Sequence, residues 1–169
     1  EMAGHAIAEA VKRSKVSKEE IDDVIIGAAG QQGSQQGNIA RQSLLRAGLP
    51  VSVAGMSLDR QCASGMMAIA TAAKEITEDG MTITVGGGVE SVSLVRNENF
   101  RMDRARDPWL EENIPSLYMT MIETAENVAK RYGISRESQD EYSLQSQMRT
   151  AKAQQNGLSL IHISEPTRR

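Results

Sequence analysis

The stretch VSVAGMSLDRQCASGMMAIATAAKEITEDGMTITVGGG, residues 51–88, decides the fold class. Residues 51–58 are predicted to form a β-strand, and residues 63–77 carry apolar side chains at the three- and four-residue spacing of a helix. An Asp-Gly turn at 79–80 precedes a further strand, predicted over 81–85. Strand, helix and strand joined by short connections predict an α/β fold built in layers. Because the helix is apolar or small on most sides, we expect it to be buried, with its apolar row formed by Met66, Ile69, Ala70, Ala73 and Ile76.

The preceding residues continue this alternation. A helix is predicted over 3–14 and a short strand over 24–26. Residues 17–20, Ser-Lys-Glu-Glu, fit a capping box at a helix start. A second helix is predicted to begin at an Asn38 cap and to stop before Gly48 and Pro50.

The composition and hydrophobic pattern of the sequence change after about residue 95. Residues 96–113 are charged and loop-like, residues 116–132 carry an amphipathic helical pattern, and Ser135 caps a mostly polar helix that runs to Gly157. We therefore expect a partial α/β core over 1–95 and the start of a helical loop domain, an insertion, over 96–157, with the boundary near 95–115.

Composition excludes several classes of protein. A net charge of -3 gives no basis for binding nucleic acid or an anionic membrane, and no apolar run approaches the roughly 20 residues of a membrane span. The chain has one cysteine and two histidines, which rules out an intrachain disulfide and leaves no credible zinc site. We expect a cytoplasmic protein without a metal.

Cys62 is the candidate nucleophile. It is predicted to lie between a strand end and the first turn of a helix, where free backbone amides and the helix dipole favour a thiolate. The same amides can receive the oxyanion that forms when a thioester carbonyl is attacked. The alternative is a buried structural cysteine that packs as a small apolar side chain.

Glycine-rich segments and one carboxylate complete the candidates. The glycines at 86–88 and at 27, 30 and 33 fit neither a dinucleotide fingerprint nor a P-loop. They are more typical of turns where backbone passes close to backbone. Glu90 follows the predicted strand, either as a general base or, more typically for a carboxylate at a strand end, as an acceptor for backbone amides.

Five ordered motifs carry a family resemblance. They are DRQCASG at 59–65, GNIAR at 37–41, AGLP at 47–50, GGVES at 87–91 and TAENVA at 124–129. Together they resemble the thiolase family, the acetyl-CoA acetyltransferases and 3-ketoacyl-CoA thiolases, over residues 1–157. The resemblance implies an incomplete thiolase-like layered fold, a mixed sheet with a buried helix.

The resemblance also implies an activity. The residue matching Cys62 takes an acyl group from acyl-CoA and passes it to a second acyl-CoA, and the reverse reaction cleaves a 3-ketoacyl-CoA. Coenzyme A thioesters would be substrates, no cofactor would be bound permanently, and the protein would be a homodimer or homotetramer. Met121 matches a methionine that lines the acyl pocket.

Three positions depart from the family pattern. Asp59 replaces an asparagine, and Thr120 and Ile122 replace the histidine and glycine that flank the methionine. These changes leave open a non-catalytic thiolase-like protein that binds acyl-CoA or lipid. A ketoacyl synthase that uses a carrier protein is disfavoured by the motif at 124–129.

The ends of the chain carry two further expectations. The activating histidine and the second cysteine of the family belong to a C-terminal half, so we expect an N-terminal fragment that is inactive alone. Residues 158–169 resemble a translated sequencing adapter rather than native sequence, and a natural β-strand is the alternative for 158–163. On the adapter interpretation His162 has no function.

Overall fold

The computed structural model describes residues 1–158, and the chain divides into two compact units, Glu1–Ala105 and Arg106–Arg169. The division lies within the interval 95–115, where the sequence changes in composition and pattern. The prediction for the tail, including His162, lies outside the described residues except for Leu158.

The first unit contains a three-stranded sheet. Strands β1 (Asp23–Gly27), β2 (Ala54–Leu58) and β3 (Thr84–Gly88) lie in the order β2-β1-β3, and both pairs are parallel. The expectation of a mixed sheet is therefore wrong for the described strands. Helices α2 (Ile39–Arg46) and α3 (Ser64–Thr77) lie in the two connections between strands and return the chain to the same end of the sheet, which makes successive strands parallel.

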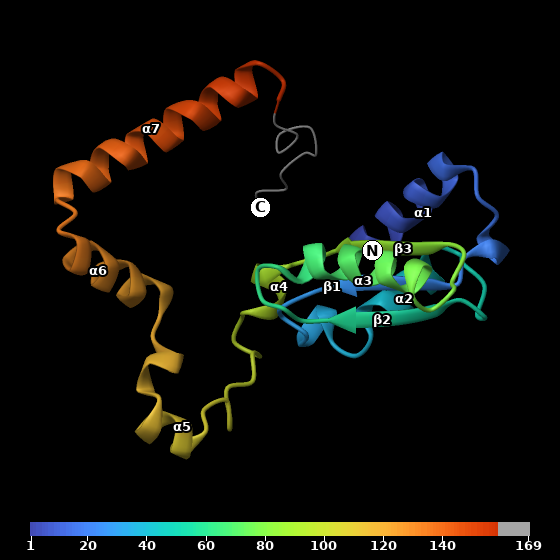
Figure 1. The fold of residues 1–169 in the computed structure, drawn as a ribbon, viewed down its shortest axis with the longest axis horizontal. Coiled ribbons are helices and arrows are strands. Elements are labelled where there is room, and N and C mark those ends of the chain that lie inside the picture. The colour runs from blue at the N-terminus through green and yellow to red at the C-terminus, as the bar shows by residue number, and fades with distance from the viewer. Residues whose placement is uncertain (159–169) are drawn as a thin grey trace. The chain divides into compact units, whose positions relative to one another are not determined.

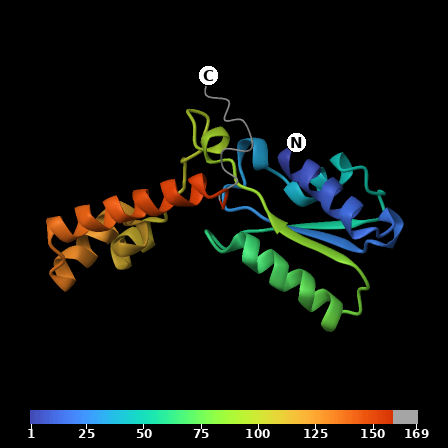
Figure 2. The same ribbon diagram turned by 90° about the horizontal axis from the view of Figure 1, so that it is seen from above.

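Helices cover both faces of this sheet, which confirms the predicted layered α/β architecture (Figures 1 and 2). Helices α1 (Met2–Ser14) and α2 pack on one face and α3 on the other. Along β1 the side chains alternate between the faces: Val24 and Ile26 join the core beneath α1 and α2, whereas Ile25 packs against Ala68 and Ala72 of α3. All three β1 side chains are buried.

Helix α3 begins where the sequence predicts but buries a different face. Its buried residues are the small or polar Ser64, Ala68, Ala72 and Glu75. The apolar row expected to be buried is exposed instead, with 77% of Met66 and 57% of Ile69 accessible. The reason is steric: only small side chains allow the helix backbone to approach glycine-rich strands this closely.

The glycines of β3 explain that approach. The predicted strand stops at residue 85, yet residues 86–88 form the last three positions of β3. A Cβ on Gly86 would lie 2.9 Å from the Ile69 Cα atom, so the helix passes directly over the strand. The prediction that these three glycines form a turn is wrong, and the prediction that they permit close backbone contact is confirmed.

The caps at the starts of the helical segments match those predicted from the sequence. Ser17 and Glu20 form the predicted capping box, although it starts a 3-10 turn, Lys18–Glu20, rather than an α-helix. The Asn38 side chain accepts a hydrogen bond of 3.0 Å from the Arg41 amide at the start of α2. Gly48 follows that helix with a φ of 77°, a conformation that favours glycine.

The second unit is helical. It contains α5 (Pro108–Asn113), a 3-10 turn (Pro115–Tyr118), α6 (Met121–Tyr132) and α7 (Arg136–Gln155), and none of these elements has a buried residue. Thr120 and Ser135 cap the two longer helices, and Gly133 ends α6 in the left-handed conformation. Within residues 1–158, no helix has both the length and the apolarity to cross a membrane.

Candidate active site

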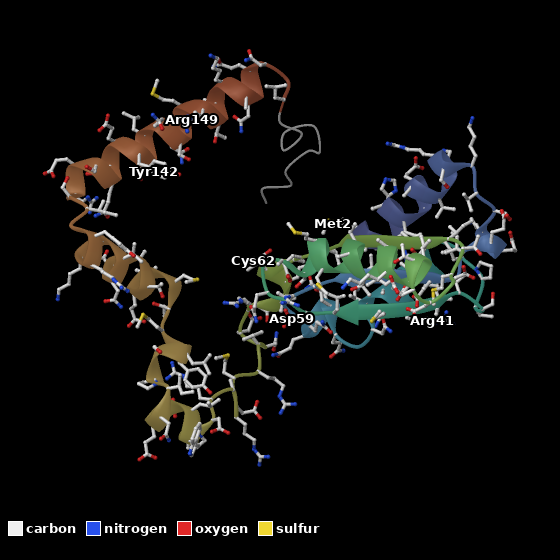
Figure 3. All side chains as sticks on the ribbon, in the orientation of Figure 1. Met2, Arg41, Asp59, Cys62, Tyr142 and Arg149 are labelled. Atoms are coloured by element: carbon white, nitrogen blue, oxygen red, sulfur yellow. The ribbon has the colours of Figure 1, made fainter. Side chains whose placement is uncertain are left out.

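Cys62 lies on a sharp turn between β2 and α3, two residues before the first helical residue (Figure 3). Gln61, immediately before it, has a φ of 51°, a left-handed conformation that costs a non-glycine residue about 1 kcal/mol. The Ser64 hydroxyl stabilises the turn, since it accepts from the Arg60 amide at 2.8 Å and donates to the Gln61 carbonyl at 2.6 Å. The predicted placement between strand end and helix start is confirmed.

Two glycines bring this turn onto the ends of the central and outer strands. A Cβ on Gly27 would lie 2.2 Å from the Ser64 carbonyl carbon, and one on Gly88 would lie 3.0 Å from the Gly65 Cα atom. Gly27 and Gly88 are register partners at the ends of β1 and β3. The first residues of α3 therefore lie against the backbone of β1 and β3 at the carboxyl end of the parallel sheet. Open α/β sheets bind their ligands at this end.

Cys62 is an exposed residue with a free thiol. A buried structural cysteine, the alternative left open by the sequence, is therefore wrong for this chain. The Asp59 carboxylate has a partner within the turn, because its Oδ1 accepts a hydrogen bond of 2.7 Å from the Gln61 amide. The departure from asparagine at position 59 thus preserves an acceptor that shapes the turn.

Glu90 joins the loops that follow β1 and β3. Its carboxylate accepts hydrogen bonds from the Ala29 amide at 2.8 Å, the Gly30 amide at 3.3 Å and the Gln35 side-chain amide at 2.6 Å. The Gln35 bond, followed by the backbone bonds and the charge of Arg96, holds the pKa of Glu90 below its ordinary value, and desolvation opposes them in part. Bonding to backbone amides is confirmed, and a carboxylate held by three donors is poorly suited to act as a base.

Gln35 is the residue that sequence reasoning missed. It is 2% exposed and ends the short 3-10 turn Gly33–Gln35. Besides Glu90, its side-chain amide donates to the Gly30 carbonyl at 2.8 Å, and its oxygen accepts from the Ser91 amide. No periodic pattern marks a polar residue in a loop as buried, so only the partners brought together by the fold reveal it.

These loops and the turn enclose a pocket of about 600 Å³. Its walls come from the segment after β1, the Cys62 turn, the end of β3, and the short helix α4 (Val92–Val95) with the residues that follow it. Such a volume suits a small organic ligand. The chemically distinctive lining residues are Gln61, Cys62, Ser64, Glu90, Arg96 and Phe100.

The other predicted site residue belongs to the second unit. Met121 is the first residue of α6 and is 75% exposed. Its role in an acyl pocket stays a prediction. His5 lies on the exposed side of α1, and residues 1–158 contain no cluster of three or more metal-ligating side chains.

The model of the thiolase N-terminal domain matches residues 1–161 of this chain. The chain belongs to the thiolase family. The resemblance seen in the five sequence motifs is thereby confirmed.

Known thiolases align along most of this chain. An acetyl-CoA acetyltransferase from Chromobacterium violaceum is 39% identical over 93% of the chain, and a 3-ketoacyl-CoA thiolase from Bacillus subtilis is 39% identical over 89%. The chain spans 42% and 38% of those two relatives. The crystal structure of the Bacillus anthracis acetyl-CoA acetyltransferase, at 38% identity, superposes with a TM-score of 0.69 over 88% of this chain and 40% of that one.

Proposed function

We propose that the protein containing this chain is a thiolase-type acyltransferase that works through an acyl-enzyme on Cys62. The observation that carries the proposal is an exposed thiol on a strand–helix turn that opens into a 600 Å³ pocket. Membership of the thiolase family supports it, as do relatives named acetyl-CoA acetyltransferase and 3-ketoacyl-CoA thiolase.

In the proposed reaction the Cys62 thiolate attacks the carbonyl carbon of an acyl-CoA. A new carbon–sulfur bond forms to Sγ, the bond to the coenzyme A sulfur breaks, and coenzyme A leaves as a thiolate that takes up a proton. The α-carbon of a second acyl-CoA, after losing a proton, then attacks the carbonyl carbon of the Cys62 thioester. A carbon–carbon bond forms, the bond to Sγ breaks, and a 3-ketoacyl-CoA is released while Cys62 returns to the thiolate. The reverse sequence is thiolytic cleavage.

The turn offers one amide for the oxyanion of the first step. The amides of Ala63 and Ser64 donate to the Arg60 and Gln61 carbonyls, each at 3.1 Å, and are already occupied. We propose that the Cys62 amide itself donates to the oxyanion. Gly65, which has no side chain to obstruct the approach, allows the substrate carbonyl to come close to this backbone.

The proposal extends to ligands and assembly. Coenzyme A thioesters are the substrates, with no permanently bound cofactor, and the protein is a cytoplasmic homodimer or homotetramer that binds neither nucleic acid nor membrane. The modest net charge of -3 supports the exclusion of nucleic acid.

Acyl trapping tests the function. The protein that contains this chain should acquire radiolabel from [1-¹⁴C]acetyl-CoA, and peptide mapping should place the label on Cys62, the only cysteine in these 169 residues. Cys62→Ala should lose the label from this segment, because no other thiol here can form the thioester. Thr77→Ala, a change at the far end of α3, serves as a folded control and should keep it.

Two outcomes contradict the proposal. Label that persists on residues 1–169 in Cys62→Ala removes the nucleophile assignment. Binding of acetyl-CoA without any acylation of the native protein favours the non-catalytic acyl-CoA-binding alternative.

A further inference from the structure

Two buried carboxyl side chains lie between α3 and the central strand, at the end of the sheet opposite the Cys62 turn. Asp23 is the first residue of β1 and is 8% exposed, and Glu75 lies in the last turn of α3 and is 7% exposed. Burial of a carboxylate is costly unless a cation or hydrogen-bond donors replace its hydration. Neither residue lines the Cys62 pocket or takes part in the proposed acyl transfer.

The alternation of side chains along β1 places Asp23 on the face that α3 covers. Ile25, two residues further along the strand, packs on that face against Ala68 and Ala72. Side chains two positions apart in a strand point to the same face. On the helix, Glu75 belongs to the same buried row as the two alanines. Asp23 and Glu75 therefore extend the contact between β1 and α3 by one further step.

Glu75 has no partner that would stabilise its negative charge. Within residues 1–158, its Oε2 is the one buried side-chain atom without a hydrogen-bond partner. Neither Glu75 nor Asp23 forms an ion pair in that part of the chain. Asp23 differs in one respect, because its Oδ1 accepts a hydrogen bond of 2.6 Å from the Val24 amide. An unpartnered buried oxygen costs less on a neutral carboxylic acid than on a carboxylate.

No neighbouring cation neutralises the two carboxyls. Strands β2 and β3 contain no titratable residue, and Asp23 is the only one in β1. The titratable residues of the flanking segments are all exposed; they are Asp22, Lys74, Glu78 and Asp79. Burial, followed by the negative charges of Asp23 and Asp79, raises the pKa of Glu75 above its ordinary value. Burial also raises the pKa of Asp23, although its backbone hydrogen bond opposes this in part.

We propose that Asp23 and Glu75 form a carboxyl pair that keeps one proton after exposed carboxyls have ionised, and that this proton holds the end of α3 on β1. With the proton in place, one member is neutral and can donate a hydrogen bond. Once the proton is lost, two negative charges face each other across the contact and repel. Residues 1–158 contain no cluster of three or more metal-ligating side chains, so the pair is suited to a proton rather than a metal ion. This pH-sensitive attachment does not depend on the proposed acyl transfer.

Proton release on unfolding tests the pair directly. At about pH 6 the carboxyls of an unfolded chain are ionised, so a proton kept by the pair must leave when the 169-residue chain unfolds. Calorimetric unfolding in buffers of different ionisation enthalpy counts this proton. We expect the native chain to release about one proton more than Glu75→Gln or Asp23→Asn. Glu78→Gln, the same chemical change at an exposed position, should release as many protons as the native chain.

The pH dependence of stability tests the sign. A carboxyl whose pKa is raised by folding favours the folded chain fully below its ordinary value, 4.5 for Glu75, and this contribution is lost as the pH rises through the raised value. The folded-to-unfolded ratio of the native chain, relative to that of Glu75→Gln, should therefore fall about tenfold between about pH 5 and about pH 8. Urea unfolding over this range measures the ratio.

Two outcomes overturn the proposal. One is equal proton release and parallel stability profiles for the native chain and Glu75→Gln. The other is an excess proton that is lost in Glu75→Gln but kept in Asp23→Asn, because the proton then results from the burial of Glu75 alone. Both substitutions keep the size of the side chain, so they change its charge with little change in packing.

Discussion

At the scale of single residues, Glu90 and Gln35 connect loops that are far apart in sequence. Fifty-five positions separate them, yet their side chains are 2.6 Å apart at the hydrogen-bonding atoms. Through Glu90 the loop after β1 is tied to the loop after β3, and both loops line the Cys62 pocket. The pair therefore shapes the pocket walls without providing the reacting group.

Replacing Glu90 by Gln should reveal this role through the pH dependence of stability. The carboxamide keeps the size of the side chain, but its NH2 group would face the N–H groups of Gln35, Ala29 and Gly30 that now donate to the carboxylate. We expect the free energy of unfolding to fall by about 1 kcal/mol near pH 7, a value discounted for the exposure of this side chain. Urea unfolding over a pH series measures it.

The sign of the pH effect follows from the lowered pKa of Glu90. A carboxylate whose pKa is depressed by folding contributes stability above its ordinary value, near 4.5, and loses it as the pH falls through the depressed value. The difference between the native chain and Glu90→Gln should therefore be constant at neutral pH and shrink below about pH 4.5. Glu98→Gln, whose carboxylate accepts only a 3.4 Å bond from Asn99, should show little difference at any pH. A gap of 1 kcal/mol that persists in acid would refute the assignment.

At the scale of elements, the approach of α3 to β1 fixes the Cys62 turn. The helix can begin on the strand end only because Gly27 has no side chain, since a Cβ there would lie 2.2 Å from both the Ser64 carbonyl carbon and its oxygen. Backbone atoms cannot yield as a flexible side chain can. The position of the nucleophile thus depends on a residue that carries no chemistry of its own.

Gly27→Ala should displace the start of α3 and destabilise the first unit by about 3 kcal/mol. Thermal unfolding followed by circular dichroism measures the loss, and the rate of Cys62 alkylation reports the displacement. Gly87→Ala is the matched control, because a Cβ there would meet its nearest atom, Ile26 Cδ1, at 3.8 Å. Equal melting temperatures for the two variants would show that the close contact at Gly27 is not required.

The same contacts explain how far the sequence could predict these elements. The starts of α2 and α7 follow from the Asn38 and Ser135 caps, and the start of α3 follows from periodicity. The layered fold follows from the alternation of helices with strands. The buried face of α3 does not follow from apolarity, because the close approach to the sheet requires small side chains at the buried positions. The Gln35–Glu90 bond did not follow either, since it joins loops whose proximity exists only in the fold.

At the scale of the whole chain, the two units differ in how they are stabilised. The first has a core on each side of its sheet, formed beneath α1 and α2 on one side and beneath α3 on the other. In the second unit, no residue of 106–158 is buried. Its helices are therefore stabilised within the unit by caps and local hydrogen bonds alone. Isolated helices as short as α5 and α6 are marginal in water without tertiary packing.

The exposed row of α3 gives the chain a property that neither unit's core predicts. Met66, Ile69 and Ile76 are 77%, 57% and 44% exposed and recur at helical spacing, so they form an apolar stripe. Apolar side chains gathered on one surface bind hydrophobic dyes and promote association, whereas single exposed ones do not.

We expect the 169-residue chain to enhance the fluorescence of 8-anilinonaphthalene-1-sulfonate and to self-associate with increasing concentration. Met66→Lys combined with Ile69→Lys should reduce both effects at least about threefold. Val51→Lys, which replaces a 79% exposed apolar residue outside the stripe, should change neither. Dye binding that is equal in the double variant and the native chain would place the apolar surface elsewhere, and sedimentation velocity on the same samples would show whether association follows the stripe.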